Sequence, residues 1–367
     1  MKKNVPKKYP LGNRTSPTLD TWKRLYKAVR IFYERRPWED LLNEDLFAVI
    51  GPVSGQTGYC CVMGDGGMEY GMQVYMGDNG LRIFHKTITG EMGPGEMLQE
   101  LRCIGVLFNS KNFLDARDLA PIKKLLVPFK GNSRPQFRSY NPGYIPWYIS
   151  DDEAQFLAYC LEQAVIVADE VADNCDFVVN EGPGGKILFR ISEISEGIFQ
   201  WKSQYRTLTI PDDPIIPQYE ADEFSVAVLA RKPVEKGTFW EVDCIPMPAP
   251  IMDTEPPRLP RVFVCVESKV GLALGHEIFT VDQDHVKLTG DKILDFLKGQ
   301  EQKPSEIHFC KPYFVECLSP FLKTIGVKPK LVDKLAILAE FEEGMNQHLS
   351  KSMHAEKNRK PFGESIL

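Results

Sequence analysis

Apolar residues recur along the chain with two different periods, and these periods predict most of its helices and strands. Short apolar runs bounded by glycine predict three β-strands within residues 47–84, with turns at 65–67 and 77–80. A 3.6-residue spacing predicts a helix over residues 19–32, with its apolar face at positions 22, 25, 26, 29 and 32. We expect the three strands to form the hairpins around which the first half of the chain is organised.

The clearest helix is predicted to begin at Ser150, where Ser150 and Glu153 have the spacing of a capping box. Its apolar stripe continues to Val171, and such a stripe is typical of core packing. Alternating residues over 176–209 then predict strands that are interrupted by a glycine-rich turn at 182–185. A further hairpin is predicted from two strands, 224–230 and 238–245.

The last third of the chain alternates strands with helices. The pattern predicts strands at 262–266, 272–279, 307–309 and 330–332, and helices at 291–298, 313–325 and 335–348. Helices that follow strands in this order cover a mixed sheet. The predicted fold class is therefore an α+β N-terminal domain of antiparallel hairpins and helices, followed by an α/β C-terminal domain with a mixed sheet.

Chain length and proline content indicate two domains. The 367 residues exceed what one hydrophobic core commonly holds, and an acidic segment with three prolines at 210–222 forms a natural linker. We expect one domain over 19–209 and a second over 223–349. The polar ends, 1–18 and 350–367, are expected to be flexible tails.

Composition narrows the class of protein further. The net charge of −6 counts against a nucleic-acid partner without excluding a local contact, because basic residues do gather in the first 36 positions. The nine cysteines contain no CxxC pair and fit free buried thiols, which indicates a reducing, cytoplasmic location. No secretion signal or membrane-spanning apolar run is visible, so no membrane contact is expected.

An aromatic and proline-rich segment at 135–148 is the candidate binding surface. Three prolines and a glycine there predict an irregular loop. Such a loop either caps a core or lines a binding site, and both alternatives stay open. The residues that would contact a protein or peptide partner are Phe137, Arg138, Tyr140, Tyr144 and Trp147.

A strand that ends in Val266-Glu267-Ser268 and turns at Gly271 resembles a motif of the RNase H-like fold of integrases and transposases. The resemblance implies clustered carboxylates that hold two Mg²⁺ ions. Glu267 would be the first carboxylate, and the final helix offers Glu340 as another. The second is expected to end the strand at 307–309, where this chain has Cys310, and a thiol is a poor magnesium ligand.

The whole chain also resembles a bacterial family of two-domain proteins of unknown function. The resemblance rests on a Gly-Tyr-Cys-x-Val-Met-Gly strand at 58–64, a Tyr-Gly-x-x-Val-Tyr strand at 70–75 and a Phe-Arg-Ser-Tyr-x-Pro-Gly-Tyr-x-Pro-Trp segment at 137–147. It implies the two-domain architecture and carries no activity with it.

These patterns favour a non-catalytic binding protein without a cofactor or metal. His308 and Cys310 would lie on the same side of a strand as two metal ligands, but ordinary packing is the preferred interpretation. The alternative is a divalent-metal-dependent nuclease or nucleotidyl-transfer enzyme that uses Glu267, Glu277 and Glu340 with Mg²⁺. That enzyme needs a second carboxylate within a few ångströms of Glu267.

Overall fold

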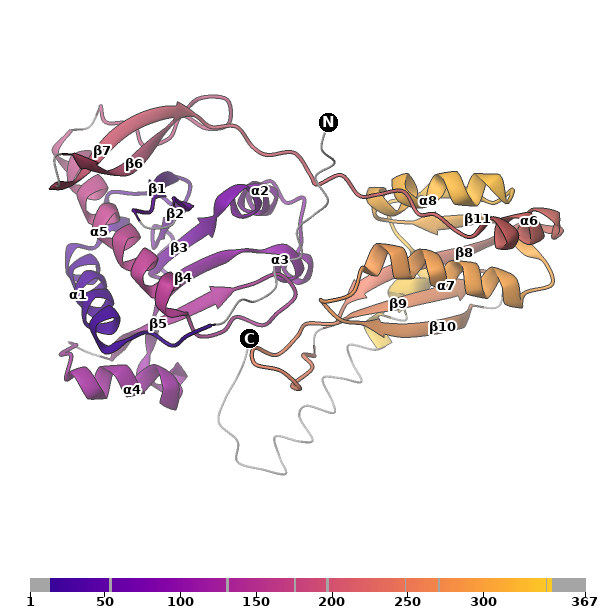
Figure 1. Cartoon of the computed structure of the whole chain (residues 1–367), viewed down its shortest axis with the longest axis horizontal. Helices are drawn as coiled ribbons and strands as arrows, with labels where there is room; N and C mark the ends of the chain where they lie inside the picture. The colour runs from indigo at the N-terminus through magenta and orange to yellow at the C-terminus, as the bar shows by residue number, and fades with distance from the viewer. Residues whose placement is uncertain are drawn as a thin grey trace. The chain divides into compact units, whose positions relative to one another are not determined.

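The computed structural model describes residues 14–52, 55–129, 132–174, 176–195, 198–247, 249–269, 271–340 and 342–344. Two compact units divide this part of the chain after Asp213. Each unit consists of one β-sheet with helices packed on it (Figure 1).

The N-terminal unit contains a seven-stranded sheet in the order β5-β4-β3-β2-β1-β6-β7. Neighbouring strands are antiparallel except β1 and β6, which run parallel. Its strands are β1 (Phe47–Ile50), β2 (Thr57–Met63), β3 (Gly71–Met76), β4 (Cys103–Ser110), β5 (Ser133–Tyr140), β6 (Lys186–Ser195) and β7 (Ile198–Thr207). Its helices are α1 (Leu19–Arg35), η1 (Pro37–Glu39), α2 (Gly77–Ile88), α3 (Pro94–Glu100), η2 (Lys111–Phe113), α4 (Ala116–Leu125) and α5 (Asp151–Asp173).

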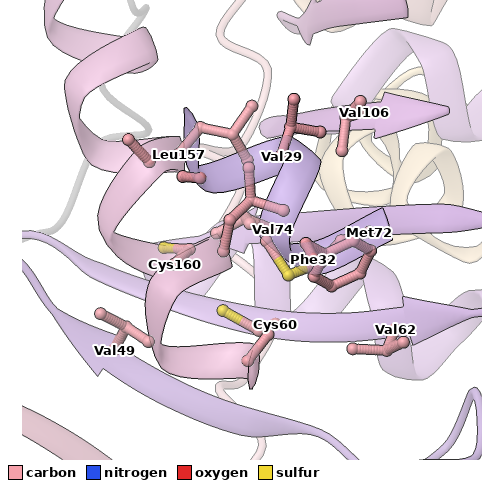
Figure 2. Close-up of a cluster of buried hydrophobic side chains, with 14 of the residues drawn as sticks. Val29, Phe32, Val49, Cys60, Val62, Met72, Val74, Val106, Leu157 and Cys160 are labelled. Carbon is pink, nitrogen blue, oxygen red and sulfur yellow. The ribbon is translucent and has the colours of Figure 1, made fainter. Parts of the chain in front are cut away.

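Alternation along the strands gives this sheet two apolar faces. Val49, Cys60 and Val74 point toward α1 and α5, where Val29 and Leu157 complete the main core (Figure 2). The intervening strand residues form a second cluster against α2 on the opposite face. The strands β1 and β2 therefore bury both of their faces, which is why their apolar runs are nearly continuous.

The C-terminal unit contains a five-stranded mixed sheet in the order β10-β9-β8-β11-β12. The long central strand β8 pairs antiparallel with β9 and parallel with β11. Its strands are β8 (Val234–Pro246), β9 (Arg261–Glu267), β10 (Leu272–Phe279), β11 (Lys303–Phe309) and β12 (Lys328–Leu331). Its helices are α6 (Glu223–Arg231), α7 (His285–Gly299) and α8 (Pro312–Thr324), and residues 336–340 and 342–344 are also helical.

The predicted fold class is confirmed, since an α+β unit precedes a unit with a mixed sheet and helices. The three strands predicted within 47–84 are β1, β2 and β3. The capping box at the start of the long helix is also present, because Ser150 and Glu153 side chains each accept a hydrogen bond from the other's backbone N–H.

Three predictions about local structure are wrong. Residues 77–80 begin helix α2 instead of forming a turn, with Gly77 at a φ of 59° where the chain leaves β3. Residues 133–140 form β5, in which Pro135 is tolerated because β5 is an edge strand. Residues 223–231 form α6 instead of a strand, and the Asp222 side chain caps this helix by accepting a hydrogen bond from Ser225 N.

Candidate functional site

Strand β5 divides the aromatic segment into buried and outer side chains. Phe137 is 5% exposed and packs edge-on against Tyr26 in the main core. Tyr140 is half-buried, and burial raises its pKa. Arg138 points to the other side of the strand, where its guanidinium binds both carboxylate oxygens of Asp118 at 2.7 and 2.9 Å. Phe137, Arg138 and Tyr140 therefore have partners within the unit.

A buried polar network holds the segment in place. Glu153 is 8% exposed and accepts hydrogen bonds from Ser139 Oγ at 2.8 Å and from Arg14 Nη2 at 2.8 Å. Ser139 also pairs through its backbone with Trp147, at N···O distances of 2.7 and 2.9 Å in the two directions. Asn141 donates to Ser139 Oγ at 2.9 Å. The capping box of α5 thus also anchors the aromatic segment, because one carboxylate serves both.

Three outer side chains of the unit form what we call the aromatic–arginine cluster: Arg117, Trp147 and Tyr148. The rings of Trp147 and Tyr148 meet edge to face at 5.0 Å between centroids. The Arg117 guanidinium carbon lies 5.7 Å from the Trp147 centroid and 5.1 Å from the Tyr148 centroid. Both aromatic residues are half-buried, as is the neighbouring Tyr144.

The Tyr148 hydroxyl donates a hydrogen bond to Asp115, the N-cap residue of α4. Burial, and then this bond to a carboxylate, raise the pKa of Tyr148 well above its usual value. The phenol therefore stays neutral and fixes the ring against α4. Sequence reasoning did not single out Tyr148 or Arg117, because the contact depends on a helix that lies about 30 positions earlier in the chain.

Several of the described basic residues of α1 are ion-paired within the unit. Arg24 on α1 contacts Glu162 on α5 at 2.8 Å, and Arg35 contacts Asp169 on α5 at 2.5 Å. Within α1, Lys23 pairs with Asp20 at 2.9 Å. Acidic residues of α5, a helix far from α1 in the sequence but packed against it, therefore neutralise part of the basic charge near the N-terminus.

In the C-terminal unit, the structure does not bring Glu267, Glu277 and Glu340 together. Glu277 lies opposite Phe263, four positions before Glu267 on β9, which corresponds to about 13 Å along the strand. Glu277 instead forms an ion pair with Lys292 on α7. Glu340 belongs to the helical residues that follow Leu335, and Leu335 packs against Val266 on the sheet face opposite to that of Glu267.

The carboxylate that does lie beside Cys310 is Asp243 on β8, which the sequence analysis missed. Cys310 Sγ donates to Asp243 Oδ2 at 3.4 Å, and Lys311 Nζ lies 3.0 Å from Asp243 Oδ1. Burial, and then the Asp243 charge, raise the pKa of Cys310 to about 12. This shift favours the protonated thiol at neutral pH, which is a weaker nucleophile than the thiolate.

Two further polar side chains share this face of the sheet, and each has its own partner. Glu241 accepts hydrogen bonds from the backbone N–H groups of Ile337 and Leu338, both at 2.9 Å. His308 Nε2 lies 2.8 Å from Glu306 Oε2, and its ring stacks on Phe239. His308 and Cys310 do share a face, but they contact different carboxylates.

Among the described residues, His, Cys, Asp and Glu side chains form no group of three or more that could hold a metal ion. The eight cysteines described are free. The structure therefore defines a two-unit α+β protein with one outward aromatic–arginine cluster and one face of buried, paired polar residues.

Comparison with known families agrees with this division. One domain of unknown function, DUF7309, matches residues 22–190, and a second, DUF6930, matches residues 225–346. The chain therefore combines these two domains of unknown function in N- to C-terminal order. No curated protein matches the chain. No helix in the part of the chain that is described is both long and apolar enough to span a membrane.

Proposed function

We propose that this chain is a non-catalytic binding protein that contacts a protein or peptide partner through the aromatic–arginine cluster. The observation that carries the proposal is the position of the Arg117 guanidinium over the rings of both Trp147 and Tyr148. Tryptophan, tyrosine and arginine are the residues that most often supply the binding energy of protein interfaces. Tyr144 extends this surface along the same segment.

The polar network beneath the cluster supports this assignment. The Ser139–Glu153 bond and the Ser139–Trp147 backbone pair fix the segment before any partner binds. A surface that is already ordered loses less conformational entropy on binding. The motif at 137–147 then has two roles, with Phe137 and Ser139 holding the segment and Trp147 presenting its ring.

The surroundings of Asp243 support a function without catalysis. Lys311 places a positive charge 3.0 Å from the Asp243 carboxylate, and the raised pKa of Cys310 favours its protonated thiol. A two-metal centre needs several anionic oxygens around a shared cation. For the C-terminal unit we propose an RNase H-like relationship, supported by the mixed sheet with β8 at its centre. The Asp243–Lys311 ion pair lies on the face of this sheet opposite to that of Glu267.

A photo-crosslinking amino acid at position 144 tests the proposed surface. We expect it to form one dominant adduct in extract of the source cells, whose partner is then identified by mass spectrometry and purified. Trp147→Ala should weaken binding of that partner about 30-fold or more, since central aromatic residues contribute about 2 kcal/mol or more. Tyr205→Ala, an exposed aromatic position on β7, is the matched control and should bind normally.

Thermal unfolding distinguishes binding from packing. Trp147→Ala should leave the melting temperature within a few degrees of the parent, because the ring is half-buried. A large drop in stability without a specific loss of binding would assign the segment to the core alone. Cleavage of DNA or RNA that depends on Mg²⁺ or Mn²⁺ and that Glu267→Gln abolishes would establish the nuclease alternative instead.

A further inference from the structure

Helix α6 presents an apolar face that no described residue covers. The Phe224 side chain is 79% exposed and Val228 is 40% exposed, although Leu229 and Ser225 on the other side of the helix are buried. Ala227 is also exposed. At 100° per residue, Phe224, Ala227 and Val228 lie on one continuous face. This short helix lies beside α7 and α8 (Figure 1). Its largest side chain, Phe224, is exposed to solvent.

Opposite charges mark the two ends of the same face. Glu223 begins the helix and Arg231 ends it, and both are exposed. Within the described part of the chain, neither side chain has an ion-pair partner. With the three apolar residues they span an arc of about 140°. From the N-terminal to the C-terminal end of α6, this face therefore carries a negative charge, an apolar centre and a positive charge.

This order is complementary to itself when the direction of the helix is reversed. Ala227 is the midpoint of the nine residues of α6, so a two-fold axis there places Glu223 of one protomer opposite Arg231 of its partner. The small alanine side chain at the axis lets two helices approach closely. Phe224 of each copy then packs beside the axis against the apolar face of the other.

We propose that α6 is a self-association surface through which two copies of this chain pair antiparallel. The contact is small, because a nine-residue helix is about 14 Å long and covers less than the roughly 800 Å² per partner of a standard interface. The dimer is therefore weak and forms in a concentration-dependent way. The proposal does not depend on the function proposed for the N-terminal unit.

Sedimentation velocity of the full chain over about 1 μM to 1 mM tests the pairing. The wild-type protein should shift from monomer to dimer with rising concentration. Phe224→Glu should weaken dimerisation at least tenfold, because it places two carboxylates beside the axis. Met252→Glu, at a 68% exposed apolar position of the same unit, is the matched control and should dimerise as the wild type does.

Charge reversal tests the antiparallel arrangement. Glu223→Arg and Arg231→Glu should each weaken the dimer, because each creates two like-charged pairs, and the double variant should recover it. A wild-type chain that stays monomeric throughout, as it would if another part of the same chain covered α6, overturns the proposal. So does a double variant that is no better than the single ones, or a Phe224→Glu variant that dimerises normally.

Discussion

The sheets of the two units bury their second faces in different ways. In the N-terminal unit, the second face of β1 and β2 carries Ala48, Tyr59 and Cys61, which form an apolar cluster with Leu81 and Phe84 of α2. In the C-terminal unit, the second face of β8 combines Ile245 with the carboxylates of Glu241 and Asp243. An apolar face accepts any well-fitting cover, whereas a buried carboxylate needs a particular donor.

This difference shows which interactions fix the arrangement of helices and strands in each unit. Apolar packing dominates the main core of the N-terminal unit, in which Figure 2 shows side chains of α1, α5 and the strands in one cluster. In the C-terminal unit, Asp243 selects Lys311, and Glu241 selects the first N–H groups of the last helix. Polar pairs of this kind fix one arrangement because alternatives leave a buried charge without a partner.

The largest effect should come from the apolar core. Leu157→Ala removes a fully buried side chain between α5 and the sheet, and we expect it to lower the free energy of unfolding of the N-terminal unit by about 2–5 kcal/mol. Hydrogen exchange of β2 peptides should accelerate while β9 peptides stay protected. Equal acceleration in both units would show that they unfold together and would remove the contrast.

The next effect should come from the buried carboxylate that caps the last helix. Glu241→Ala leaves the N–H groups of Ile337 and Leu338 without their acceptor, which should lower stability locally by about 1–3 kcal/mol. Exchange should increase first at residues 336–344. Glu241→Gln keeps one acceptor oxygen, and its stability should lie between those of the wild type and Glu241→Ala. A Glu241→Ala variant with unchanged stability and exchange would contradict the capping role.

A smaller effect is expected from pH. The hydrogen bond with His308, and then the nearby lysines at 328 and 330, hold the pKa of Glu306 below its usual value. Because the pKa is lower in the folded than in the unfolded state, this carboxylate stabilises the C-terminal unit above the unfolded pKa of about 4.3. That stability is lost as the pH falls through the lower folded value. Glu306→Gln should reduce the fall in melting temperature between about pH 5 and pH 3, and an unaltered profile would exclude this contribution.

The smallest effect should come from exposed ion pairs in either unit. Lys23→Ala breaks the pair with Asp20 on α1, and Lys287→Ala breaks the pair with Asp291 on α7. We expect each to change the free energy of unfolding by less than about 0.5 kcal/mol, since solvent screens such pairs. A loss above about 1 kcal/mol by chemical denaturation would mean that the side chain packs as well as pairs.

Local sequence patterns alone determined those helices and strands in which the spacing of apolar residues matches the spacing of buried positions. The long helix α5, with its Ser150–Glu153 capping box, and the strands β1, β2 and β3 were predictable because neighbouring residues settle caps, turns and strand alternation. The aromatic segment was also recognisable by composition. Its division into an anchoring half at Phe137 and an outer half at Trp147 was not.

Only the tertiary structure decided β5, α6 and the partners of the polar residues. Pro135 fits a strand because β5 lies at the sheet edge, and edge position is a property of the whole sheet. The apolar run at 224–230 suggested a strand, yet its capping residue and its packing on α7 and α8 make it a helix. Asp243 meets Lys311, 68 positions later, because β8 and β11 lie side by side, and no local pattern encodes such a contact.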